Sequence, residues 1–173
     1  MKGGVDLRRL RDLVRLFDGL RMLHDELFHV LESKIDAMRR ADVTGIQSAG
    51  EREQVIVLRM QEREGFRRQL MEAIGGDLGL SAKAARSLTV SQLAARLPDP
   101  ERNLVVNAGS RLQTVMAKSA QANRLAATIA RDVVQHMKWV FAAVRPADAV
   151  PVGYTGRGRT VVIDDASLFE AVG

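Results

Sequence analysis

The sequence has 173 residues, of which 46% are hydrophobic, 27% charged and 4% aromatic, and its formal net charge is +5. This balance is typical of a globular chain with one core and excludes a disordered one. Cysteine is absent, which excludes disulfides and thiolate metal sites and fits the reducing cytoplasm, and no apolar run approaches the roughly 20 residues of a membrane helix.

The first segment, from about 6 to 40, carries apolar residues at alternating steps of three and four, which predicts one long helix with a heptad seam. A second apolar stripe widens this face, so we expect the helix to pack against more than one neighbour. The seam consists of Leu10, Leu13, Phe17, Leu20, His24, Leu27, Leu31, Lys34/Ile35 and Met38, and the second stripe of Leu16, Leu23 and Val30.

A second long helix is expected over residues 43–74, with Asp42 as its N-cap. The link between the first two helices is short, which requires an antiparallel hairpin. Gly75 is the expected residue just past the helix end. The seam is weaker here because charged residues interrupt it, and it consists of Ile46, Ala49, Glu53, Ile56/Val57, Met60, Phe66, Leu70 and Ile74.

Residues 81–97 are predicted to form a short, broken helical insert, with Thr89 as the cap of its second piece and Pro98 beyond its end. The last long helix is expected over residues 100–144, since proline is tolerated in a first turn. The small middle of its seam permits close helix packing, whereas its bulky end needs a partner surface. The seam consists of Val105, Ala108, Leu112, Val115, Ser119, Ala122, Ala126, Ile129, Val133, His136, Val140 and Ala143.

Proline and glycine become dense after residue 145 and the apolar period is lost, which predicts a flexible C-terminal tail over residues 146–173. Residues 160–163 could form a strand, but an all-α chain offers no evident partner for it. We therefore predict an all-α fold, an elongated antiparallel helical bundle or coiled coil of three long helices with a short insert. Residues 1–145 would form the helical domain.

No arrangement of residues points to catalysis, a cofactor or a metal ion. His24 and His136 lie on seams of different helices, and Phe28 and Val140 occupy the positions four residues on where a second metal ligand would be expected. No Glu-x-x-His pair and no Gly-Lys-Ser/Thr phosphate loop is present. The sequence therefore indicates a binding protein and not an enzyme.

Three helices cannot cover every apolar stripe, and we expect the excess on the bulky end of the last helix. Anchors at such helical spacing are typical of helix-in-groove recognition. The same residues could instead form plain core or the seam of a homodimer without a client. They are Leu125, Ile129, Val133, Met137, Val140 and Phe141.

The basic charge leaves a nucleic-acid partner open as a third alternative. Residues 156–159, Gly-Arg-Gly-Arg, are typical of RNA-binding segments, but they occur once. The arginine doublets elsewhere lie close to acidic residues, which favours solvated helix faces. Nucleic-acid binding is therefore the least favoured alternative.

Several segments together resemble the FlgN-type flagellar export chaperones over about residues 6–165. Helix-like segments at 31–42 and 60–63, a short helix at 90–94 after a glycine loop, and a loose tail with Tyr154 and Gly156 are all similar to the family's layout. Residues 121–125, Gln-Ala-Asn-Arg-Leu, are similar to the family's Asn-x-x-Asn-Arg-x-Leu pattern. The sequence departs from that pattern at Ala120, and it is more basic than most export chaperones.

This resemblance implies a cytoplasmic chaperone that holds hook-associated proteins of the FlgK and FlgL type unassembled and delivers them to the flagellar export apparatus. It implies binding of their C-terminal amphipathic helices chiefly through the last long helix. The client-binding residues implied by position are Asn123, Arg124 and Leu125 with the apolar residues that follow, Ile129, Val133, Met137, Val140 and Phe141.

Overall fold

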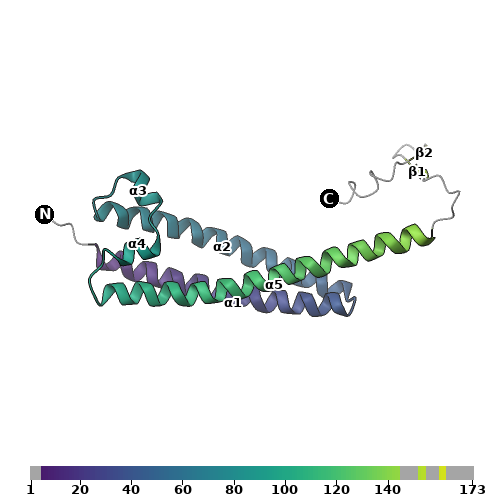
Figure 1. The fold of residues 1–173 in the computed structure, drawn as a ribbon, viewed down its shortest axis with the longest axis horizontal. Helices are drawn as coiled ribbons and strands as arrows, with labels where there is room; N and C mark the ends of the chain where they lie inside the picture. Colours follow the sequence, from purple (N-terminus) through teal and green to yellow (C-terminus); the bar gives the residue numbers. More distant parts are fainter. Residues whose placement is uncertain (1–4, 145–151, 155–159, 163–173) are drawn as a thin grey trace. The chain divides into compact units, whose positions relative to one another are not determined.

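The computed structural model describes residues 5–144, 152–154 and 160–162 of the chain (Figure 1). The chain divides into two units, Met1–Arg131 and Asp132–Gly173, and α5 is one continuous helix that begins in the first and ends in the second. In chain order the elements are α1 (Leu7–Arg39), α2 (Val43–Asp77), α3 (Ala82–Arg86), α4 (Val90–Ala94), α5 (Glu101–Val144), β1 (Val152–Tyr154) and β2 (Thr160–Val162).

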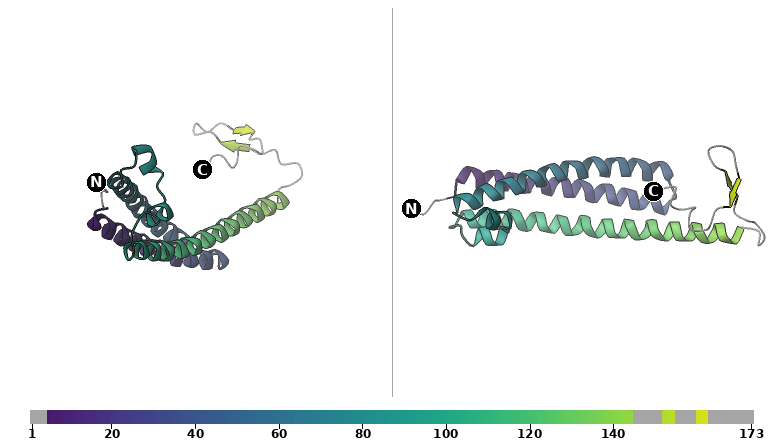
Figure 2. Two further views of the ribbon diagram at one scale, coloured as in Figure 1. Left: turned by 60° about the vertical axis from the view of Figure 1, so that its left-hand side comes forward. Right: turned by 90° about the horizontal axis from the view of Figure 1, so that it is seen from above.

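The helices α1 and α2 form the predicted antiparallel hairpin and run side by side (Figure 2). Asp42 caps α2 as expected, because its Oδ1 accepts the Gly45 N–H at 2.9 Å. An ion pair of 2.7 Å joins Lys34 to Glu53 near the turn, and Arg9 pairs with Asp77 at 2.6 Å near the other end. These two pairs fix the antiparallel register of the hairpin.

The first part of α5 packs along α1 in the same direction and therefore runs antiparallel to α2. The small residues of its seam are buried as predicted: Ala122 and Ala126 share a cluster with Leu31 and Ile35 of α1. Ser119 is also buried, at 3% exposure. The three long helices thus form the expected antiparallel arrangement, with α1 contacting both of the others.

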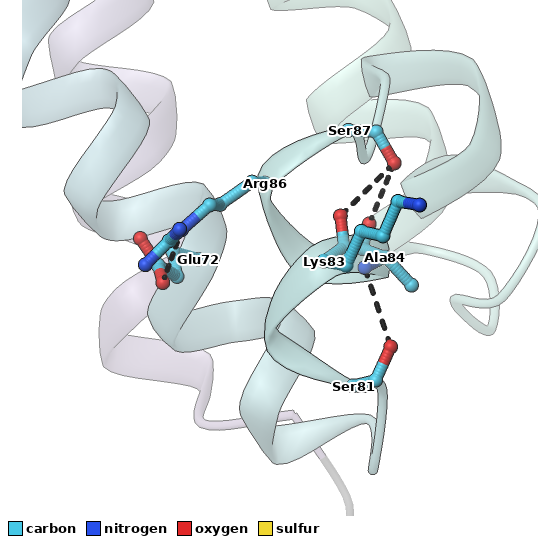
Figure 3. Close-up of polar contacts among 6 residues, drawn as sticks. All are labelled: Glu72, Ser81, Lys83, Ala84, Arg86 and Ser87. Carbon is cyan, nitrogen blue, oxygen red and sulfur yellow. Dashed lines mark hydrogen bonds and ion pairs between the residues drawn. The ribbon is translucent and has the colours of Figure 1, made fainter.

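The short insert lies where α2 ends and α5 begins (Figure 1). Figure 3 shows how α3 is held: the Ser81 hydroxyl caps its start, and Arg86 pairs with Glu72 of α2 at 3.1 Å. Thr89 caps α4 through a reciprocal capping box with Gln92. The insert completes the largest core cluster with its apolar residues Leu88, Leu93 and Leu97.

The predicted end of α2 at Gly75 is wrong, because the helix continues to Asp77. Gly79 is the residue with positive φ, at 73°, and the helix ends in a Schellman motif: the Gly79 N–H donates to the Gly76 carbonyl and the Leu80 N–H to the Gly75 carbonyl. Gly75 is instead buried inside the helix, where Ala85 of α3 packs against it. The absence of a side chain at Gly75 therefore allows α3 to pack closely against α2, and this residue does not end the helix.

Gly75→Ala is expected to destabilise the fold, whereas Gly76→Ala one position later is expected to stabilise it. A Cβ at Gly75 would lie 2.5 Å from the Ala85 Cβ and 2.9 Å from its Cα, so α3 would have to move. Such overpacking costs about 1–3 kcal/mol. A Cβ at Gly76 meets nothing within 4 Å, and alanine in a helix is favoured over glycine by about 1 kcal/mol. Urea unfolding of both variants measures these opposite signs; equal effects would contradict the proposed contact.

The predicted seam of α2 is wrong at Phe66, which is 53% exposed. The buried positions Ile56, Met71 and Ile74 are connected by steps of three and four through Met60, Glu64 and Arg67. Glu64 and Arg67 therefore occupy positions on the core-facing side of the helix, and Phe66 lies off it. Charged residues were expected to interrupt the seam, with Glu53, Arg63 and Arg67 on or near it, but Glu64 was not placed there.

The strand expected near residue 160 has a partner after all. Antiparallel pairing joins β1 to β2, with Val152 opposite Val162 and Tyr154 opposite Thr160. The expectation of an unpaired strand is therefore wrong, since the mate is supplied locally by a hairpin. The rest of the predicted flexible tail over residues 146–173 lies outside the described residues.

Candidate partner-binding surface

The apolar residues predicted for partner binding form a ridge on α5. Residues 125, 129, 133, 137 and 141 are four apart, which places neighbouring members next to one another on the helix surface. None of residues 131–144 is buried. We call these six residues the α5 ridge: Leu125 (45% exposed), Ile129 (partly buried), Val133 (45%), Met137 (50%), Val140 (47%) and Phe141 (64%).

The structure does not bring Asn123 and Arg124 onto this ridge. Both are exposed, but consecutive residues of an α-helix point about 100° apart, so Asn123, Arg124 and Leu125 face three directions. Ile129 packs partly against the cluster formed by Leu31 and Ile35, where the covered part of the seam ends. Of the predicted site residues that are apolar, Ile129 alone is partly covered, and Leu125 and the four from Val133 onward are exposed.

A cleft between α2 and α5 is a second candidate site, and the sequence analysis missed it. Its volume is about 760 Å³, and α1 supplies its floor while α4 closes one end. Much of its lining is apolar, including Phe17 and Leu20 of α1, Val57 and Met60 of α2, and Leu112 and Met116 of α5. The signal in the sequence was the charged residues on the seam of α2. A core-facing position that carries a charge needs contact with solvent, which a cleft beside the helix provides.

The charged groups of the cleft lie on its α2 wall. Arg67 donates to both oxygens of Glu64, from Nε at 2.8 Å and from Nη2 at 2.6 Å. This hydrogen bonding holds the pKa of Glu64 below its usual range and raises the pKa of Arg67, although burial opposes both changes. Arg68 lines the same wall, so the ionised groups there sum to one positive charge.

His24 is the titratable group of α1 in the cleft, and it is held by α5. Its Nδ1 lies 3.0 Å from the Ser119 Oγ, and the Ser119 hydroxyl also lies 3.1 Å from the Met116 carbonyl oxygen. A hydroxyl has one hydrogen, which goes to the carbonyl, so the His24 Nδ1–H donates to Ser119. Burial lowers the pKa of His24 below 6.5.

His24 is expected to make the fold less stable as the pH falls below 6.5. The unfolded chain takes up the proton more readily than the folded one, because the folded pKa is the lower of the two, so the free energy of unfolding decreases. His24→Asn retains an N–H donor near Nδ1 and should show a smaller loss between pH 7.5 and pH 5 in urea unfolding. Identical pH profiles for the wild type and for His24→Asn would refute this role.

Other chemistry finds no support in the described residues. They contain no group of three or more side chains able to hold a metal ion. None of their helices has the length and apolarity of a membrane span.

Comparison with protein families finds a match to the family described as FlgN protein, over residues 7–161 of the chain. The matched range includes all five helices, β1, and β2 except its last residue. No curated protein and no solved structure matches the chain.

Proposed function

Because the chain belongs to the FlgN protein family, a family of flagellar export chaperones for hook-associated proteins, we propose that its α5 ridge binds the C-terminal amphipathic helix of a client. The family is not enzymatic, and its members are cytoplasmic. The proposed clients are hook–filament junction proteins of the FlgK and FlgL type, and the proposed recipient is the flagellar export apparatus.

The exposure of the α5 ridge is the observation that supports this proposal. Val133, Met137 and Phe141 retain 45%, 50% and 64% of their surface on one face of a regular helix. Apolar area removed from water contributes about 25 cal/mol per Å². A client helix laid along the ridge would cover these side chains, and its own apolar face would be covered in return.

The mechanism requires no nucleotide and no covalent step. A client helix destined for a polymer exposes an apolar seam before assembly, and that seam is an aggregation hazard while it is uncovered. The ridge covers this seam reversibly, and release follows when a competing partner binds the client more tightly. Standard specific complexes bury about 800 Å² on each side.

Isothermal titration tests this function with the full chain in the cell and the C-terminal peptide of a hook–filament junction protein in the syringe. We expect saturable binding with one peptide per chain and an increase in helix content. Absence of binding, together with sedimentation of the chain as a tight dimer at micromolar concentration, would favour a structural homodimer and overturn the proposal.

A further inference from the structure

Resting on the proposed function, we infer that the cleft between α2 and α5 is a second client-docking site, which takes an amphipathic client helix with a carboxylate on its flank. The α5 ridge and the cleft would then hold two segments of one client. Three features of the molecule support this second site: the separation of the core into clusters, the shape of the cleft and its charge.

The hydrophobic core consists of separate clusters because α2 and α5 diverge from one another along α1. At the insert end one cluster unites α1, α2, α4 and α5, including Met71 of α2 and Leu112 of α5. Farther along, Leu23 and Val30 of α1 pack on α2, whereas Leu31 and Ile35 of α1 pack on α5. The cleft begins between these arrangements, where α1 remains as the floor and no residue among those the structure describes fills the space above it.

The shape of the cleft fits a helix. Its walls run from Val57 to Arg68 on α2 and from Val106 to Met116 on α5, which at 1.5 Å per residue is roughly 16 Å, or about three turns. Exposed apolar side chains line both walls: Val57 is 36%, Val106 44% and Met116 45% exposed. A client helix placed in the cleft would complete a four-helix bundle with α1, α2 and α5.

The α4 helix sets the closed end of the cleft. Val90 of α4 approaches α5 at Gly109, where an added Cβ would lie 3.2 Å from the Val90 Cγ1. Glycine at this position therefore lets the insert come close to α5, and Val90 and Ser91 face the cleft. A docked helix would end against this stop, with about three of its turns inside the cleft.

The charge of the α2 wall selects an acidic partner. Arg67 is already paired with Glu64, whereas Arg68 interacts with Glu64 only through the attraction of their charges and forms no hydrogen bond or ion pair within the described residues. A carboxylate on the flank of the docked helix would pair with Arg68 at the rim of the cleft, while the apolar face of that helix covers Met60, Leu112 and Met116. A lysine at that point of the client would be repelled.

The test compares two client probes, the full-length hook–filament junction protein and its C-terminal peptide, by isothermal titration with the full chain. Arg68→Glu combined with Met116→Glu is expected to weaken binding of the full-length client at least tenfold and to change peptide affinity less than twofold. The matched control, Arg59→Glu with Met22→Glu, makes the same charge change at exposed positions outside the cleft and should leave both affinities unchanged.

Unchanged affinity of the cleft variant for the full-length client overturns the second site and leaves the proposed function intact. An equal loss for client and peptide also overturns it, since both probes would then use one site. Failure of the wild-type chain to bind either probe is the separate result that rejects the proposed function.

A photo-cross-linking residue keeps the inference testable if the cleft variant unfolds. Substituted at Gln113 in the cleft wall, it should cross-link to the full-length client; substituted at Gln69, an exposed residue of α2 outside the cleft, it should not. Equal cross-linking from both positions, or none from Gln113, contradicts a client helix in the cleft.

Discussion

Replacing Val133 and Phe141 together by alanine is expected to weaken binding of the client's C-terminal peptide by about 10- to 100-fold. Burial of such side chains contributes about 1.5–3 kcal/mol each when they begin fully exposed, and about half of that remains to be gained here. Each 1.4 kcal/mol corresponds to roughly a tenfold change in affinity. Isothermal titration measures this loss.

The same double variant should unfold as the wild type does, because both residues are exposed in the free chain. Circular dichroism and urea unfolding check this. Trp139→Ala is the matched control: Trp139 is 70% exposed on the same helix turns but points away from the α5 ridge. A loss from Trp139→Ala as large as that of the double variant would show that the client uses a different face of α5.

Phe17→Ala is expected to have the largest effect on stability, lowering the free energy of unfolding by about 3–5 kcal/mol. Phe17 is 1% exposed and belongs to the cluster that joins α1 to α2, the insert and α5. Its removal leaves a cavity at the point where four helices meet, and these cannot all move in to fill it. Urea unfolding measures the change through the midpoint, with an unchanged slope showing that the transition remains two-state.

Phe66→Ala provides the matched control for this prediction. Phe66 is 53% exposed on α2, so alanine there should change the free energy of unfolding by less than about 1 kcal/mol. The two variants remove the same atoms, and they differ only in burial. A similar loss for both would mean that Phe66 is covered in solution and that the described seam of α2 is in error.

The core positions of α1 followed closely from the heptad pattern. Leu10, Leu13, Phe17, Leu20, Leu31 and Ile35 were expected on the seam and are buried. The wide face of α1 also predicted two neighbours, and α2 and α5 both pack on it. These features are predictable because a helix repeats every 3.6 residues, and its apolar period therefore reports its buried face.

Charged seam positions were harder to place. Glu64 and Arg67 lie on the core-facing side of α2 at the cleft, whereas the apolar Phe66 between them is exposed. An apolar residue is the better guess for burial when only the sequence is known. That guess fails where the neighbouring helices are farther apart, because the face then borders an open cleft.

The sequence by itself determined where the helices begin and which residues are apolar and evenly spaced, since capping, proline placement and helical period act between residues close in the chain. It also determined that the C-terminal end of α5 carries more apolar side chains than is usual for a helix surrounded by solvent. Only the tertiary structure decided that Gly75 is a packing contact, that β1 supplies a mate for β2, and that α2 and α5 part to open a cleft. These features depend on which distant segment of the chain lies opposite each residue. The distance between α2 and α5, which both pack on α1, is not set by interactions between residues close in the sequence.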